Sequence, residues 1–194
     1  MHPEARHFLD FVKNAFPKFF EGVRCLDAGA ADINGNNRHY FSNSEYIGND
    51  VFPAPNVTIL SKTSDLRFTD GHFDTIVSSE CFEHDLFYRE SLQNIVRMLR
   101  PGGLFGFTCA STGRAEHGTL RTSPHASMTT QTGDMEWANY YKNLTEGDVR
   151  EAVDIDSEFE HYQFVYNPTS YDLYFWGIKK GGNNDSNPPF YEIQ

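Results

Sequence analysis

Apolar residues recur at helical and strand spacing along most of the chain. A helical period covers residues 3–16, and Pro3 suits the first turn of that helix. A second helical period places Leu92, Ile95, Val96 and Leu99 on one face and is expected to end at Pro101, with Arg97 and Arg100 in its last turn. Short apolar runs predict five buried strands, at residues 23–28, 46–48, 57–60, 73–78 and 104–109.

Strands that alternate with helices favour a parallel sheet covered on both faces. Residues 145–148 (TEGD) fit a capping box at the start of a further helix. Two aromatic runs, 159–166 and 171–178, follow, and only a short turn joins them. We therefore expect an antiparallel last strand in an otherwise mostly parallel α/β sheet with helices on both faces.

The pattern predicts one domain over residues 1–180. Within it, residues 111–141 are polar and aperiodic, which is typical of a functional or disordered segment. Residues 181–194 are expected to form a loose C-terminal tail.

Charge and cysteine content narrow the classes of function. The formal net charge is −11 over 194 residues, which disfavours a nucleic-acid partner because an acidic surface repels a polyanion. Cys25, Cys81 and Cys109 form no CxxC pair, and the sequence contains no cluster with metal-ligand spacing, so no metal is expected. No apolar run is long enough for a membrane span and no signal sequence is evident, so a cytoplasmic location is expected. The sequence does not define an oligomeric state.

Three segments at predicted strand ends carry the candidate chemistry, because an open parallel sheet binds ligands beyond its carboxyl edge. The first is 26–36 (LDAGAADINGN), in which Gly29 allows a tight turn and Ala30 and Ala31 allow a ligand close to the backbone. The second is Asp50, about 20 positions after Gly29 and suited to accept hydrogen bonds from ribose hydroxyls. The third is 78–84 (SSECFEH).

These segments, taken in order, resemble a known family. The order is strand-D-x-G, Y-I-G-x-D, F-D-x-I-V with E-H soon after, and R-x-L-R-P-G-G, over residues 23–110. It resembles the class I S-adenosylmethionine-dependent methyltransferases, with the type 11 group as the nearest match. EHGTLRTSP and YYKNLTEGDV further on are similar to a subgroup of bacterial proteins and extend the resemblance to about residue 180.

The resemblance implies a Rossmann-like fold and S-adenosylmethionine as the cofactor. It assigns cofactor binding to Asp27, Gly29, Ala30, Asp50, Val51, Asp65, Ser79 and Glu80. The chain departs from the family pattern in two places. Ala31 and Ile33 stand where the family has its second and third loop glycines, and Lys62 stands where it has an acid, so Asp65 is taken as the contact to the adenine amino group.

Two other functions stay open at this point. A nicotinamide-dependent oxidoreductase would share the acid at the end of the second strand, but it would call for G-x-G-x-x-G where this chain has G-A-A-D-I-N. A non-catalytic binding module would keep the fold without the cofactor, which the missing glycines would permit.

The acceptor is less defined than the cofactor. The acidic charge and the polar insert favour an oxygen on a small molecule or glycan. If the acceptor is a hydroxyl, a histidine titrates in the range useful for removing its proton. His117 in the insert is the first candidate base and His84, which also suits packing at a helix start, is the second; Tyr140 or Tyr141 would follow.

Overall fold

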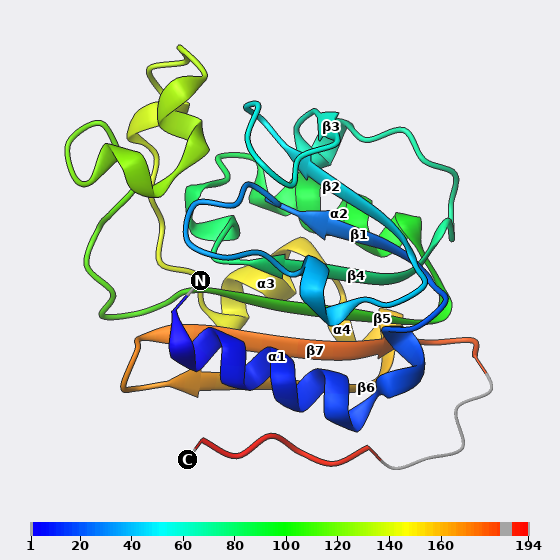
Figure 1. Cartoon of the computed structure of the whole chain (residues 1–194). Coiled ribbons are helices and arrows are strands. Elements are labelled where there is room, and N and C mark those ends of the chain that lie inside the picture. Colours follow the sequence, from blue (N-terminus) through cyan, green and yellow to red (C-terminus); the bar gives the residue numbers. More distant parts are fainter. Residues whose placement is uncertain (1, 183–187, 194) are drawn as a thin grey trace.

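The computed structural model describes residues 2–182 and 188–193 and contains one seven-stranded sheet in the order β3-β2-β1-β4-β5-β7-β6 (Figure 1). The first five strands pair in parallel, and β7 is antiparallel to both of its neighbours. This confirms the predicted sheet and its antiparallel last strand. The strands are β1 Arg24–Ala28, β2 Glu45–Asp50, β3 Ile59–Leu60, β4 Phe73–Ser79, β5 Leu99–Ala110, β6 Phe159–Asn167 and β7 Asp172–Lys179.

Helices cover both faces of the sheet. Helix α1 (Pro3–Ala15) lies in front of β5–β7 in Figure 1, and α2 (Tyr88–Met98), α3 (Glu146–Ala152) and α4 (Ile155–Glu158) lie behind. Side chains alternate across a strand, so β7 serves both cores. Tyr174 and Trp176 join the α1 core, where Phe8 stacks on Tyr174 at 4.8 Å between ring centroids, and Phe175 joins the core on the other face.

The boundary between α2 and β5 differs from the prediction. The helix ends at Met98, and β5 begins at Leu99 and continues through Pro101. A residue before proline is disfavoured in the helical conformation, and Leu99 is already extended, so Arg100 lies in the strand and not in the last turn of the helix. The extra residues are taken up by a register shift against β4, between Phe73 and Thr75.

The third strand is shorter than the expected 57–60. Val57 N donates to Ala54 O in a turn, and Thr58 N donates to Gly48 O, so paired strand geometry starts only at Ile59.

The insert 111–141 consists of loops and short 3₁₀ turns: η5 Pro124–Ala126, η6 Met128–Gln131 and η7 Trp137–Asn139. It extends from the edge of the sheet where the parallel strands end, at the upper left of Figure 1. The segment then enters α3 through the predicted capping box, in which Thr145 and Asp148 each accept from the other's backbone N–H.

Part of the C-terminal segment packs on the fold. The Tyr191 ring lies 5.2 Å from that of Phe8, and Tyr191 N donates to Gln163 Oε1 at 2.8 Å. The loose tail expected over 181–194 includes residues 183–187 and 194, which lie outside the described residues. None of the helices in the described part of the chain combines the length and apolarity needed to cross a membrane.

Candidate active site

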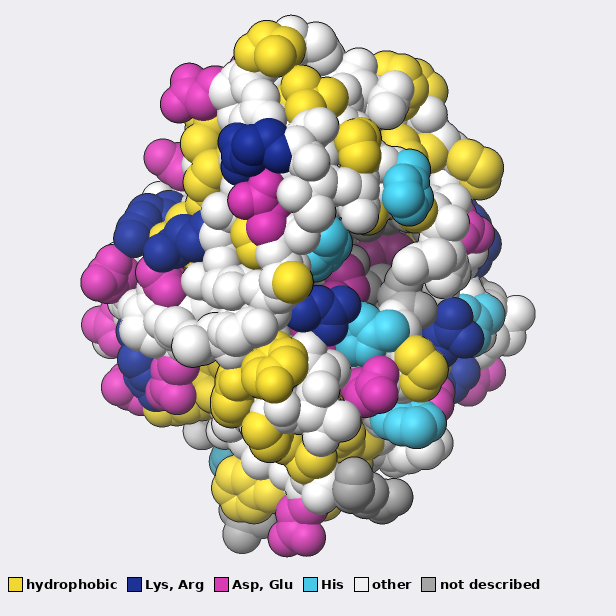
Figure 2. All heavy atoms as spheres, turned by 90° about the vertical axis from the view of Figure 1, so that its left-hand side faces the viewer, with side chains coloured by type: hydrophobic (Ala, Val, Ile, Leu, Met, Phe, Trp, Pro, Cys, Tyr) yellow, Lys and Arg dark blue, Asp and Glu magenta, His cyan; other side chains and the backbone are white. Residues whose placement is uncertain are grey.

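A cavity lies at the carboxyl edge of the sheet, where the loops after β1, β2 and β4 meet the insert. Figure 2 views the molecule from this side and shows acidic side chains inside a hollow with histidine side chains close to it. Seven of the eight predicted cofactor-binding residues line this cavity: Asp27, Gly29, Ala30, Asp50, Val51, Ser79 and Glu80.

The loop after β1 is held close to β2 by its backbone. Gly29 N and Ala30 N both donate to Asn49 O, at 3.0 and 2.9 Å. Gly29 has φ +76°, a conformation that favours glycine. A Cβ at this position would also lie 2.3 Å from Cys81 Sγ, so the turn leaves room for no side chain.

Asp50 ends β2 and faces the same loop. Its Oδ2 accepts from Ala31 N at 3.1 Å, and its Oδ1 accepts from Val51 N at 2.7 Å. Burial raises the pKa of this carboxyl, although the backbone hydrogen bonds oppose the shift. Each carboxylate oxygen has two lone pairs, so each can accept one more hydrogen bond from a ligand in the cavity.

Asp27 is buried, and its oxygens serve the protein. One accepts from the Tyr46 hydroxyl, and the other accepts from Asn37 Nδ2 at 2.9 Å. Ser79 Oγ in turn donates to Asn37 Oδ1 at 3.2 Å. Burial raises the pKa of the Asp27 carboxyl to about 6, even though the hydrogen bonds from Tyr46 and Asn37 oppose the shift. The network links β1 to the end of β4 through Asn37 and to the start of β2 through Tyr46.

Glu80 directly follows β4 and has a positive φ of 53°. Its Oε2 accepts from His2 Nε2 at 3.2 Å, whereas its buried Oε1 has no hydrogen-bond partner. An unpartnered buried oxygen in a cavity wall is suited to accept from a positively charged ligand group, such as an ammonium.

An ion-pair group formed by His2, Glu80, Arg114 and Asp172 closes one side of the cavity. His2 Nε2 lies 2.9 Å from Asp172 Oδ2, and Arg114 lies 3.4 Å from the other oxygen of Asp172. Burial lowers the pKa of His2, but the hydrogen bonds to Asp172 and Glu80 outweigh it and raise the pKa to about 10. Sequence reasoning missed this group, because nothing local links His2 to a residue in the last strand.

Asp65 is the one predicted cofactor residue that the fold does not bring to the cavity. It is exposed at the end of the 3₁₀ turn η3 (Thr63–Asp65). Ser61, Thr63 and Asn49 line the cavity in this region instead. Their hydroxyl and amide groups offer both donors and acceptors, and Asn49 already receives a hydrogen bond from Thr63 at 3.2 Å.

The two candidate bases are neighbours in the cavity wall. The rings of His84, in the 3₁₀ turn η4 (Phe82–His84), and His117 lie 4.9 Å apart, and Tyr141 lies 5.6 and 5.1 Å from them. His84 is 4% exposed, and burial lowers its pKa to about 3, helped by the charge of His117. Trp137 Nε1 of the insert donates to His84 O at 2.8 Å, which ties the insert to this turn.

Comparison with known proteins agrees with this geometry. Residues 15–107 match a family model described as a methyltransferase domain, that of the type 11 group. Comparison with curated proteins finds no match. Among solved structures, the chain is similar to the 1,6-didemethyltoxoflavin-N1-methyltransferase of Burkholderia thailandensis, with a TM-score of 0.60 and 17% identity over 92% of this chain and 80% of that one.

Two further structures are similar at the level of the fold. They are a phosphoethanolamine N-methyltransferase of Haemonchus contortus (TM-score 0.59, 16% identity, 91% of this chain and 53% of that one) and the CurJ carbon methyltransferase (TM-score 0.60, 14% identity, 90% and 54%). This chain therefore spans about half the length of these two proteins.

The strand order, the loop after β1 and the acid at the end of β2 define a class I methyltransferase fold. The family match, which covers just under half of the chain, and the similar structures, one of them with bound S-adenosylhomocysteine, support S-adenosylmethionine as the cofactor. The residues present fit that cofactor. Asp50 keeps acceptor capacity for hydroxyls, and Glu80 Oε1 is an orphaned acceptor in the same cavity.

Proposed function

We propose that this protein transfers a methyl group to an oxygen of a small molecule or glycan. The observation that supports this most is the cavity at the carboxyl edge of the sheet, which is lined both by the assigned cofactor residues and by His84 and His117. A small acceptor held in that cavity would meet a proton acceptor and the methyl donor together. Such alignment is the main contribution of a protein to this kind of transfer.

The cofactor, when bound, supplies a methyl group on a sulfonium, which is a strong electrophile. We assign the ribose hydroxyls to Asp50, because it ends β2 beside the loop after β1, and the methionine ammonium to Glu80, because its Oε1 has no hydrogen-bond partner. The loop at Gly29 and Ala30, with Val51 and Ser79, forms the surrounding wall. Asp27 acts by holding Asn37 and Tyr46, and we assign the adenine end to Ser61 and Thr63 in place of Asp65.

His117 is the better candidate base of the two histidines. Burial lowers the pKa of His84 to about 3, which makes it a weak proton acceptor at neutral pH, and only a small part of its ring reaches solvent. His117 is less buried and lies in the insert that covers the acceptor side. In the proposed transfer the acceptor oxygen forms the new bond to carbon. The sulfonium of bound S-adenosylmethionine would keep the electron pair of the carbon–sulfur bond, and His117 would take the hydroxyl proton of the acceptor.

The acceptor class rests on charge and cavity chemistry. A net charge of −11 opposes binding of a nucleic acid, and the polar part of the cavity lining, which includes Asn34, Asn36 and Ser127, offers hydrogen-bond partners for hydroxyl groups. The similar structures include proteins named as N- and C-methyltransferases. An experiment on the acceptor must therefore distinguish transfer to oxygen from transfer to nitrogen or carbon.

The direct experiment is a transfer screen with S-adenosylmethionine labelled in its methyl group against sugars, hydroxy acids, amines and peptides. Label in a sugar or hydroxy acid, located on oxygen by NMR, is the expected result. Label on nitrogen or carbon would overturn the oxygen assignment. The Asp50→Ala variant serves as the control that separates enzyme-dependent transfer from background.

A further inference from the structure

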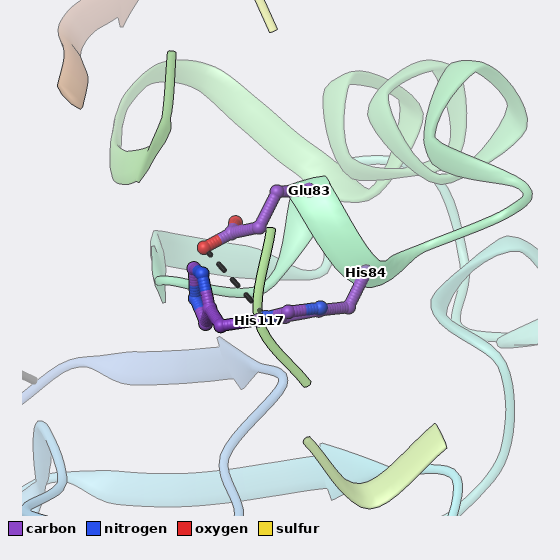
Figure 3. A group of neighbouring side chains, drawn as sticks. All are labelled: Glu83, His84 and His117. Atoms are coloured by element: carbon purple, nitrogen blue, oxygen red, sulfur yellow. Dashed lines mark ion pairs between the residues drawn. The ribbon is translucent and has the colours of Figure 1, made fainter. Parts of the chain in front are cut away.

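Glu83, His84 and His117 point toward one another beside the cavity (Figure 3). One ligand-type atom of each residue lies within 4.8 Å of those of the other two. Glu83 and His84 come from the turn η4 after β4, whereas His117 comes from the insert, so the fold and not the sequence spacing brings them together.

The group contains buried polar atoms that the protein leaves without partners. Both carboxylate oxygens of Glu83 are buried and make no hydrogen bond. Glu83 is 0% exposed. Buried polar atoms are nearly always satisfied, and a buried carboxylate in particular calls for a cation or donors.

The spacing fits an ion held between the side chains. Glu83 Oε1 and His84 Nε2 are 3.9 Å apart, too far for a hydrogen bond. Two ligands at about 2.1 Å from a shared zinc ion lie roughly 3.4 Å apart at a tetrahedral angle, so a small side-chain shift would suffice.

The Nδ1 atom of His117 helps to orient its Nε2 as a metal ligand. Nδ1 of His117 lies 3.1 Å from Ala115 O, which suits a donated N–H and leaves Nε2 with a free lone pair. A backbone carbonyl that fixes the imidazole tautomer in this way is a common partner of metal-ligating histidines.

We propose that Glu83, His84 and His117 bind a divalent transition-metal ion of the zinc type. Two imidazoles and one carboxylate are a ligand set that keeps a coordination position open for a water or substrate. Here that position would face the cavity, because His84 and His117 line it.

The role of the ion rests on the proposed function. A hydroxyl acceptor at the open position would have its pKa lowered by the ion, and it would lose its proton to solvent. In this metal-bound form His117 is a ligand, and loss of the proton to solvent replaces the proton transfer to His117 that applies without the ion.

The test is calorimetric titration of ZnCl₂ into the untagged, chelator-treated protein, with Co²⁺ absorption as an independent report of the ligand set. One ion per chain is expected, together with the visible bands of Co²⁺ bound by nitrogen and oxygen. Glu83→Gln and His117→Ala should each weaken binding by at least 10-fold. His125→Ala, which removes an exposed histidine of the same insert, should leave binding unchanged.

Each sample is also titrated with S-adenosylhomocysteine, which shows that the variants are folded and tests the cofactor site separately. Wild-type protein that binds S-adenosylhomocysteine but no Zn²⁺ overturns the metal site and leaves the proposed function intact. Equal Zn²⁺ affinity in wild type, Glu83→Gln and His117→Ala places the ion elsewhere and also overturns it.

Discussion

The carboxylate of Asp50 accepts a hydrogen bond from the backbone N–H of Ala31 at 3.1 Å. The acid that ends β2 is therefore fixed to the loop that follows β1, and both line the same cavity. Loop and acid are held in place before any ligand arrives. Such pre-organisation lowers the entropy lost on binding.

Replacing Asp50 should weaken cofactor binding. Loss of a charged hydrogen bond costs about 1.5–3 kcal/mol, so Asp50→Ala should lower the affinity for S-adenosylhomocysteine roughly 10- to 150-fold. Asp65→Ala, which removes an exposed acid outside the cavity, is the matched control and should bind as wild type does. Unchanged affinity in a folded Asp50→Ala protein would refute the ribose assignment.

Replacing Gly29 with alanine should lower the free energy of unfolding more than the same change at Gly22. Gly29→Ala introduces both an unfavourable positive φ and a Cβ 2.3 Å from Cys81 Sγ. Gly22→Ala has a similar φ of +64° but meets nothing within 4 Å. The strain alone should cost about 1–2 kcal/mol at either site, and overpacking should add about 1–3 kcal/mol at Gly29 only. Urea unfolding measures both variants, and equal losses would contradict the close contact with Cys81.

The pairing of His2 with Glu80 and Asp172 should depend on pH. Because its folded pKa of about 10 lies above the unfolded value, its contribution is complete below about pH 6.5 and is lost as the pH rises through about 10. His2 is half-buried, so solvent screening limits the effect to roughly 1 kcal/mol or less. His2→Ala should flatten this part of the stability profile, and His7→Ala, at an exposed position of α1, should not. An NMR titration in which His2 deprotonates near pH 6.5 would show that the ion pair is absent.

The insert should respond to the cofactor. Ala126, Ser127, Met128 and Thr129 line the same cavity as Asp50, so a ligand there should hold this segment closed. Amide hydrogen exchange at residues 126–129 should slow when S-adenosylhomocysteine is added, while exchange in β6, away from the cavity, should not change. Equal exchange with and without ligand would show that residues 126–129 of the insert do not take part in ligand binding.

Much of the fold could be predicted from the sequence because it depends on local patterns. β1, β4 and β7 are largely buried strands that each contain an apolar core, and the capping box of α3 is contained within four residues. The boundary between α2 and β5 was missed because Leu99 continues the helical period. The effect of Pro101 on the residue before it ends the helix sooner.

For the candidate site, too, the sequence predicts the residues that depend on local patterns and misses those that depend on tertiary packing. Asp50 and Gly29 were predictable because Asp50 is the last residue of β2 and Gly29 directly follows β1, and both strand ends face the cavity. The pairing of His2 with Asp172, and that of Glu83 with His117, depend on how distant segments pack, which no local pattern encodes. Asp65 illustrates the converse: an acid at a plausible spacing turns outward, while Ser61 and Thr63 of the same segment line the cavity.

The central claim is that the cavity at the carboxyl edge binds S-adenosylmethionine. Calorimetric titration of the wild-type protein with S-adenosylhomocysteine, beside an identical titration with NAD, tests it most directly. We expect one S-adenosylhomocysteine per chain and no heat of binding for NAD, because Ala31 and Asn34 stand where a dinucleotide loop would need its second and third glycines. Binding of NAD without S-adenosylhomocysteine, or of neither ligand, would contradict the account.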